Sequence, residues 1–231
     1  MSAPQAGRDE PKHGIVIGNE PYLTGDSAAL IEHAVAAEAA GWDGVFMGDH
    51  LVNAEWADQP QSAFDPWITL AGIATRTDDI TLGTWVTTLP RRQPWQVARN
   101  LATLDHLSDG RVTLGAGLGG ESLYTTFGEP WEPKRLGQKY DEALDIVTGL
   151  WRGDSFSYDG DHFTVDDAVM LPTPVQEPRI PIVMGCWWPN KKPFARGPTT
   201  TGSCRTSPRC SDGMTTGRER GRERRRRKSE R

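Results

Sequence analysis

The sequence of 231 residues predicts an α/β fold, in the form of a TIM-type (β/α)8 barrel that is incomplete. Short apolar runs alternate with amphipathic helical patterns, which is typical of a parallel sheet covered by helices. Polar or glycine-rich residues follow these runs, where a parallel sheet collects its ligands. The regular alternation favours a barrel over an open sheet. A closed barrel needs about eight strands, and only five strand-like runs can be counted.

The first half of the chain shows the alternation most clearly. Residues 14–18 form an apolar run, after which Ser27 can cap a helix that stops at Gly41. A buried strand is expected at 43–48. Pro66 then stands at the favoured first position of another helix.

The second half continues the same order and then departs from it. The predicted elements are a strand at 80–89, a helix from Pro94, a strand at 111–115, a helix at 135–151, a hairpin turning at Asp159-Gly160, and a strand at 181–185. Helical or strand periodicity ends after Phe194. The expected domains are therefore a polar leader at 1–12, the partial barrel at 13–194 and a basic tail at 195–231.

Charge separates the body from the tail. Residues 1–190 hold 12 lysines and arginines against 27 aspartates and glutamates, whereas residues 191–231 hold 14 against 4. The tail lacks the apolar residues that a core needs, so we expect it to be disordered. A basic arm for nucleic acid is one interpretation. Translation in a shifted reading frame explains the tail better, and a nucleic-acid partner is not expected.

Several classes of function find no support in the composition. No run approaches the about eighteen apolar residues of a membrane helix, so no membrane partner is expected. The three cysteines, Cys186, Cys204 and Cys210, do not have the spacing of metal ligands. No metal site is expected, and a reducing cytoplasm is the simplest location.

Asp49 and His50 directly follow the predicted strand at 43–48. A single histidine at such a place is most often a hydrogen-bonded structural residue. The catalytic interpretation rests on its unperturbed pKa of about 6.5, which lets histidine give or take a proton near neutrality. The residues alone leave both interpretations open.

A glycine-rich loop follows the strand at 111–115. Its sequence matches the G-x-G-x-x-G pattern of dinucleotide-binding folds, which must open a helix at once. Gly128, Pro130 and Pro133 lie in the following segment and argue against such a helix. A loop of backbone N–H groups that holds a phosphate fits either fold.

Four segments together resemble the bacterial-luciferase-like monooxygenase family over about residues 14–194. They are GWDGVFMGDH at 41–50, LGTWV at 82–86, GRVTLGAG at 110–117 and PIVMG at 181–185. The resemblance implies an oxidoreductase that uses FMN or a deazaflavin coenzyme of the F-420 type. It also implies monooxygenation or hydride transfer on a small organic substrate, and homo-oligomeric intact relatives.

The resemblance also implies roles for individual residues. His50 is the expected catalytic residue, which manages a proton at the reactive ring, and Asp49 helps to position ring or substrate. Trp85 and Val86 are expected to flank a non-prolyl cis peptide bond that supports the ring. The expected phosphate loop consists of Gly117, Leu118, Gly119 and Gly120, and Gly185 lets the backbone approach the cofactor.

Missing strands lead to an expectation about activity. An open barrel leaves unpaired sheet edges, which favour aggregation. We therefore expect poor folding and weak activity. A non-catalytic remnant that still binds the cofactor and a basic-tailed nucleic-acid binder are the alternatives.

Overall fold

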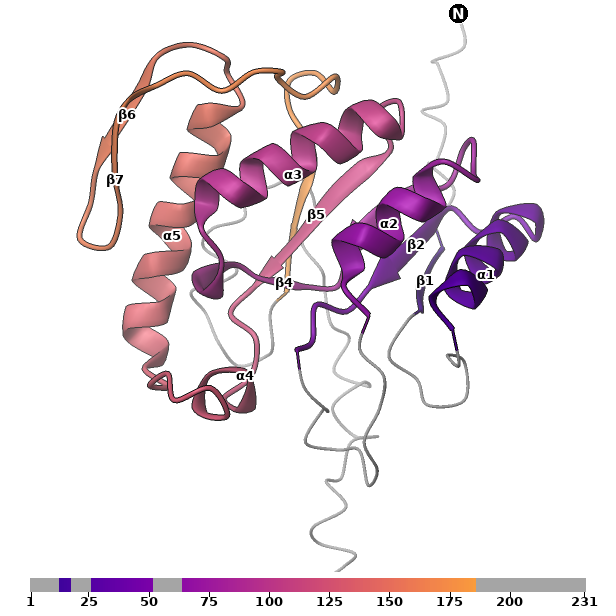
Figure 1. Ribbon diagram of the computed structural model, residues 1–231, viewed down its shortest axis with the longest axis horizontal. Helices are drawn as coiled ribbons and strands as arrows, with labels where there is room; N and C mark the ends of the chain where they lie inside the picture. The colour runs from indigo at the N-terminus through magenta and orange to yellow at the C-terminus, as the bar shows by residue number, and fades with distance from the viewer. Residues whose placement is uncertain (1–12, 18–25, 52–63, 186–231) are drawn as a thin grey trace, which may run out of the picture.

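The computed structural model describes residues 13–17, 26–51 and 64–185. Their architecture is α/β: a parallel sheet lies behind a layer of helices that covers one of its faces (Figure 1). The predicted fold class is therefore confirmed. The expected leader at 1–12 and the expected tail at 195–231 lie outside the described residues.

Five segments build the barrel part of the sheet, and one of them is interrupted. The strands are β1 (Gly14–Ile17), β2 (Gly44–Met47), β3 (Thr81–Thr84), β4 (Thr87–Thr88), β5 (Val112–Gly117) and β8 (Ile182–Met184). All pair in parallel: β1 with β2, β2 with β3, and β5 with β3, β4 and β8. The strands predicted from the sequence are thus present, and they form an arc of a barrel.

The helices join consecutive strands, as a parallel sheet requires. They are α1 (Ser27–Ala39), α2 (Pro66–Ala74), α3 (Pro94–Leu107), the single-turn α4 (Ser122–Thr125) and α5 (Pro133–Leu150), with the short 3-10 helix η1 (Leu89–Arg91) before α3. Helices α1, α2 and α3 lie in front of the sheet in Figure 1, and α5 packs beside α3.

The core lies between the sheet and this helical layer. Alternate side chains on the strands point toward the helices, as the period of two in a strand dictates. Leu82, Leu114 and Ala116 are completely buried on this face. The opposite face carries glycines and partly exposed side chains, among them Val16, which is 50% exposed.

The ends of the first two connecting helices follow simple rules with one correction. The predicted cap Ser27 is wrong, because Asp26 is the N-cap and its Oδ1 accepts the N–H of Ala28 at 2.9 Å. Gly41 stops this helix with φ +85°, as predicted. Asp65 caps α2 by accepting the N–H of Trp67 at 2.9 Å, and Pro66 begins that helix.

Charged side chains tie the loops at the amino ends of the strands. Glu38 accepts the backbone N–H groups of Asp79 and Ile80, each at 2.8 Å. The guanidinium of Arg111 donates to the carbonyls of Ala74 and Thr77 at 2.9 and 2.8 Å. These bonds satisfy backbone groups that the sheet leaves unpaired at this end.

Three further boundaries differ from the prediction. The strand expected at 80–89 is split into β3 and β4, since the chain bulges at residues 85–86. The fifth helix starts at Pro133, which fits its first turn, and not at residue 135. The segment after the glycine loop does form one helical turn, α4, which ends before Gly128.

The predicted hairpin is confirmed outside the barrel. Strands β6 (Phe156–Asp159) and β7 (Thr164–Ala168) pair antiparallel, and Gly160 lies in the turn, as expected. Glu142 of α5 fixes the turn by accepting the N–H groups of His162 and Phe163 at 2.9 and 3.1 Å.

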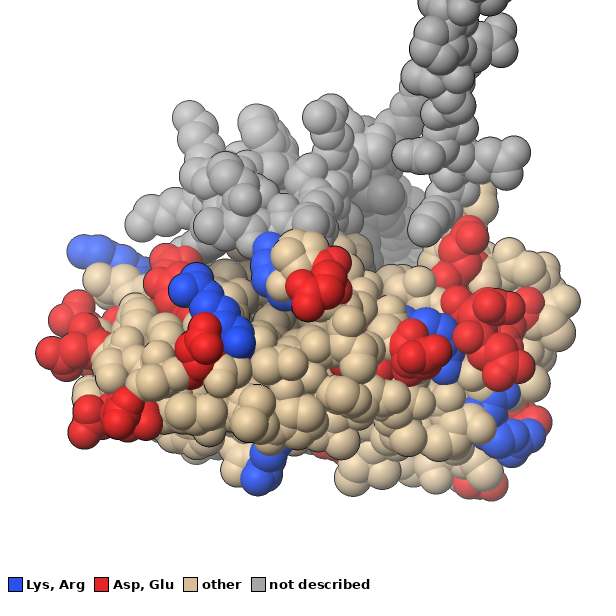
Figure 2. Space-filling model, turned by 90° about the horizontal axis from the view of Figure 1, so that it is seen from above, with Lys and Arg blue, Asp and Glu red and all other residues tan. Residues whose placement is uncertain are grey.

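Acidic side chains gather at both ends of the face drawn in Figure 2. One acidic group lies on α5, where burial and the neighbouring carboxylates of Asp141 and Glu142 raise the pKa of Asp145. In the described part of the chain, no helix is long and apolar enough to cross a membrane.

Candidate active site at the carboxyl ends of the strands

The topology brings the predicted site residues to one end of the sheet. Strand β2 pairs in parallel with β3, and β3 pairs in parallel with β5. The segments that follow these strands therefore emerge on the same side. His50 follows β2 and the glycine loop follows β5, so both lie at the mouth formed by the carboxyl ends.

His50 is half-buried beside a fully buried neighbour. Burial lowers the pKa of His50 below its ordinary value of 6.5, and the negative charge of Asp49 opposes this effect. Because burial is the larger cause, the imidazole is neutral near pH 7. A neutral imidazole is ready to accept a proton.

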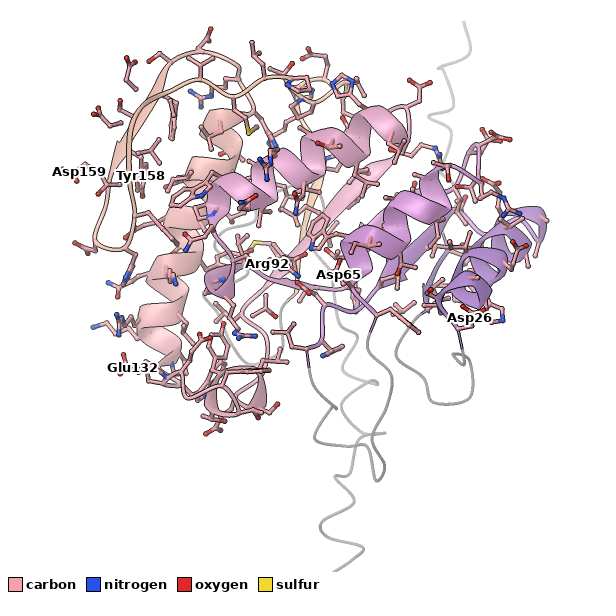
Figure 3. The ribbon with its side chains drawn as sticks, viewed as in Figure 1. Asp26, Asp65, Arg92, Glu132, Tyr158 and Asp159 are labelled. Carbon is pink, nitrogen blue, oxygen red and sulfur yellow. The ribbon has the colours of Figure 1, made fainter. Side chains whose placement is uncertain are left out.

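Asp49 forms a two-pronged ion pair with Arg92. Nε of Arg92 donates to Oδ2 of Asp49 at 2.8 Å, and Nη2 donates to Oδ1 at 2.6 Å. The side chain of Asp49 is 4% exposed and that of Arg92 26%. Figure 3 shows Arg92 near Asp65, at the start of α2. The guanidinium lies over the ring of Trp67, 5.8 Å from its centroid.

Arg92 is the site residue that sequence reasoning missed. A signal was available: Arg91 and Arg92 are adjacent and come directly after the third strand, in a body with few basic residues. A cation at the carboxyl end of one strand can pair with the carboxylate at the end of its neighbour.

The bulge in the third strand has the geometry that the family resemblance implied. The Trp85–Val86 peptide bond is cis. The N–H of Trp85 donates to the carbonyl of Met47 at 2.7 Å, which ties the bulge to β2. The Trp85 side chain is 38% exposed and meets the ring of Phe46 edge-on, with centroids 6.1 Å apart.

Three glycines make room for this bulge. A Cβ at Gly115 would lie 1.8 Å from the carbonyl oxygen of Thr84, and one at Gly117 would lie 2.4 Å from Cγ2 of Val86. A Cβ at Gly185 would lie 3.0 Å from Cγ1 of Val86. Gly117 is therefore the last residue of β5 rather than part of a loop, and both it and Gly185 contact the bulge.

The glycine loop itself begins at Leu118. Gly119 has φ +75°, a conformation that favours glycine, and a Cβ at Gly120 would meet nothing within 4 Å. Within the described residues, the N–H groups of Gly119 and Gly120 donate no hydrogen bond. Exposed, unpaired N–H groups of this kind are suited to an anion.

Leu118 has mainly a structural part in this loop. Its side chain packs against the buried cluster around Leu123, and its carbonyl accepts the hydroxyl of Tyr124 at 2.6 Å. Burial raises the pKa of Tyr124, so the phenol remains a donor. This bond fixes the loop where the two free glycine N–H groups face outward.

The described residues fit a flat aromatic cofactor with an anionic chain. The exposed face of Trp85, the cis bulge and the neutral His50 would line the ring, while Gly119 and Gly120 offer donors for a phosphate. In residues 13–17, 26–51 and 64–185, no group of three His, Cys, Asp or Glu side chains is arranged to hold a metal ion. Fold and site define the class of a barrel-type redox enzyme.

Comparison with known families names that class. The family model described as "Luciferase-like monooxygenase" matches residues 12–195. The chain therefore belongs to the luciferase-like monooxygenase family. Members of this family are oxidoreductases, and the resemblance inferred from the four sequence segments is confirmed.

Curated relatives include enzymes that depend on a deazaflavin coenzyme. The chain is 35% identical over 172 residues to the F420-dependent hydroxymycolic acid dehydrogenase of Mycobacterium tuberculosis, covering 72% of this chain and 46% of the relative. It is 35% identical over 165 residues to the F420-dependent glucose-6-phosphate dehydrogenase of Microbacterium testaceum, covering 69% and 47%. The chain thus spans about half the length of these relatives.

Solved structures agree with the fold. An F420-dependent secondary alcohol dehydrogenase, solved with an F420–acetone adduct, superposes with a TM-score of 0.63 at 26% identity. The match covers 75% of this chain and 51% of that structure.

Proposed function

We propose that this chain is a deazaflavin-dependent oxidoreductase that transfers a hydride between the coenzyme and a hydroxyl-bearing carbon of a small organic substrate. One observation carries the proposal. His50, the cis Trp85–Val86 bulge and the free N–H groups of Gly119 and Gly120 lie at the same end of one parallel sheet.

Each residue has a definite part in such a reaction. The bound coenzyme supplies a ring carbon that accepts or gives hydride. His50 takes the hydroxyl proton as the hydride leaves the adjacent carbon, so that the alcohol becomes a carbonyl. Its lowered pKa keeps the imidazole unprotonated near neutrality, ready for this step. The bulge and Trp85 support the ring from the sheet side.

The substrate class is proposed from what similar proteins share. Hydroxymycolic acid, glucose 6-phosphate and a secondary alcohol each carry a hydroxyl-bearing carbon, and the names of these relatives describe dehydrogenases. FMN is the second candidate cofactor, because the site features that face the ring suit either tricyclic system. A cytoplasmic location and a homo-oligomeric state also stay predictions.

Turnover by this chain is expected to be weaker than in its relatives. The sheet face that would surround the ring is partly exposed, as Val16 at 50% and Trp85 at 38% show. Water at a redox site weakens the electrostatic interactions that steer the reaction. Retained binding with slow chemistry is the expected pattern.

A titration tests the proposal. The purified chain is mixed with the deazaflavin coenzyme and, separately, with FMN, and the fluorescence of each is followed. Hydride transfer is then measured by loss of the oxidised absorption band with alcohols and a sugar phosphate. We expect His50→Gln to lower kcat by about 100-fold while leaving coenzyme binding within about two-fold.

His33→Gln is the matched control, since His33 is exposed on α1, away from the mouth. It should behave like the unaltered chain. Absence of binding of both cofactors would overturn the proposal, as would full activity in His50→Gln.

A further inference from the structure

We propose that Arg92 is a positioning residue that holds Asp49, and through it the adjacent His50, in the geometry of the active site. The proposal deepens the proposed function and rests on it for the catalytic part. Its structural part stands on the contacts of Arg92 alone.

The first argument is the geometry of the pair. A guanidinium and a carboxylate that meet through two parallel bonds fix each other's orientation as well as their distance. Here the bonds are 2.8 and 2.6 Å long and involve both oxygens of Asp49. The carboxylate therefore has one defined orientation, with each oxygen already bound to Arg92.

The second argument is where the guanidinium is anchored. Arg92 follows η1, and its backbone N–H donates to the carbonyl of Leu89 at 3.1 Å. The side chain then lies over Trp67 in the first turn of α2. Arg92 thus connects three segments that are distant in sequence: the end of β2, the start of α2 and the entry to α3 (Figure 3).

The third argument is burial. The side chain of Asp49 is 4% exposed, so water cannot replace Arg92 as its partner without a change in the structure. A buried carboxylate that loses its cation is strongly destabilised, whereas loss of both charges is far better tolerated. This asymmetry gives the pair a distinctive response to mutation.

His50 follows Asp49 directly in the chain, so the orientation of the carboxylate constrains the backbone that carries the imidazole. Asp49 is also the charged group among the described residues whose field acts on His50. An arginine that offsets this charge acts on His50 through Asp49. Lysine cannot reproduce the effect, because its ammonium lacks the planar fork.

The test compares five full-length variants: Arg92→Met, Arg92→Lys, Asp49→Asn, the double variant Asp49→Asn/Arg92→Met, and Arg76→Met as control. Arg76 forms an ion pair with Glu32 at 3.0 Å, with both side chains largely exposed. It therefore matches the loss of an arginine charge away from the mouth. Each variant is assayed for kcat, KM, coenzyme binding and thermal unfolding.

We expect Arg92→Met to lower kcat by about 100-fold, as misplaced catalytic groups do, with coenzyme affinity little changed. Arg92→Lys should recover part of this loss, and Arg76→Met should be unchanged. The double variant should unfold at a higher temperature than Arg92→Met alone, because it has no unpaired buried charge. Unchanged kcat in Arg92→Met, or additive losses in the double variant, would overturn the proposal.

A readout without cofactor separates this proposal from the proposed function. The pKa of His50 is followed by NMR from its ring Cε1–H signal in the free protein. We expect Arg92→Met to raise this pKa, since the charge of Asp49 is no longer offset, and Asp49→Asn to lower it. The double variant should match Asp49→Asn. An equal rise from Arg92→Met in both backgrounds would contradict action through Asp49, even if no coenzyme binds.

Discussion

The two faces of the parallel sheet differ in what fills them. On the helix-covered face, Leu82 and Leu114 are completely buried by α2, α3 and their neighbours. On the opposite face, Gly14, Gly44 and Gly83 surround the ring of Phe46, and Val16 is half exposed. Stability therefore comes mainly from the first face, whereas the second is shaped by close backbone approach.

This difference teaches where sequence change is tolerated for different reasons. Apolar volume decides the helix-covered face, because lost contacts there cannot be replaced by water. Absence of a side chain decides the opposite face, because the bulge and the glycines share its space. The candidate active site lies at the end of the second face.

The largest effect is expected where the bulge meets β5. Gly115→Ala puts a Cβ 1.8 Å from the carbonyl oxygen of Thr84, and a backbone atom cannot rotate away. We expect a loss of about 3 kcal/mol or more in the free energy of unfolding. Gly120→Ala, where a Cβ meets nothing within 4 Å, should leave stability unchanged. Urea unfolding of both variants decides, and equal stabilities would refute the packing argument.

A truncation on each face gives the next effect. Leu114→Ala removes a completely buried side chain and should cost about 3 kcal/mol. Val16→Ala, at a position that is 50% exposed, should cost less than about 1 kcal/mol. The same denaturant titration measures both. A greater loss at Val16 would mean that the second face contributes more to folding than its exposure indicates.

Glu38 offers a smaller effect at the amino ends. Burial raises the pKa of Glu38, but the backbone N–H groups of residues 78–80 and the charge of Arg111 lower it more, to below its ordinary 4.5. The resulting stability is present above about pH 4.5 and is lost as pH falls through the lowered value. Glu38→Gln should cost about 1 kcal/mol at pH 7 and show a flatter acid limb. Parallel acid limbs would contradict this assignment.

His50 should give the smallest effect on stability. Its pKa is lowered in the folded state by burial, so protonation favours unfolding. The contribution of the neutral ring is present above pH 6.5 and is lost as pH falls from there through the lowered pKa. Thermal unfolding between pH 7 and 5 (values of about 7 and 5, bracketing the histidine range) should fall more steeply than in His50→Gln. Superimposable curves would contradict burial as the cause.

The sequence predicted most of the arrangement that positions the site. Apolar runs with period two and glycine or proline at helix ends identified the strands and helices, and the parallel order put His50 and the glycine loop at one end. These features depend on neighbours in the chain. The contact between Asp49 and Arg92 joins residues 43 positions apart, so no local pattern required it.

Other departures have the same origin. Gly117 belongs to β5 because the Val86 side chain occupies the space beside it, which is a contact between strands. The helical turn α4 forms since its four residues precede Gly128 and the prolines that stop it. Short elements of this kind depend on tertiary contacts, here the packing of Leu123 and Tyr124 against Leu136.

The central claim is that the mouth at the carboxyl ends binds a flavin-like ring with its anionic chain on the glycine loop. The most direct measurement follows backbone amide signals by NMR while the deazaflavin coenzyme or FMN is added. The account predicts that the signals of Gly119 and Gly120 shift together with those of Trp85 and His50, while Gly153 beyond α5 stays fixed. Saturable binding that leaves these four signals unmoved, or shifts only residues at the opposite end of the sheet, would contradict it.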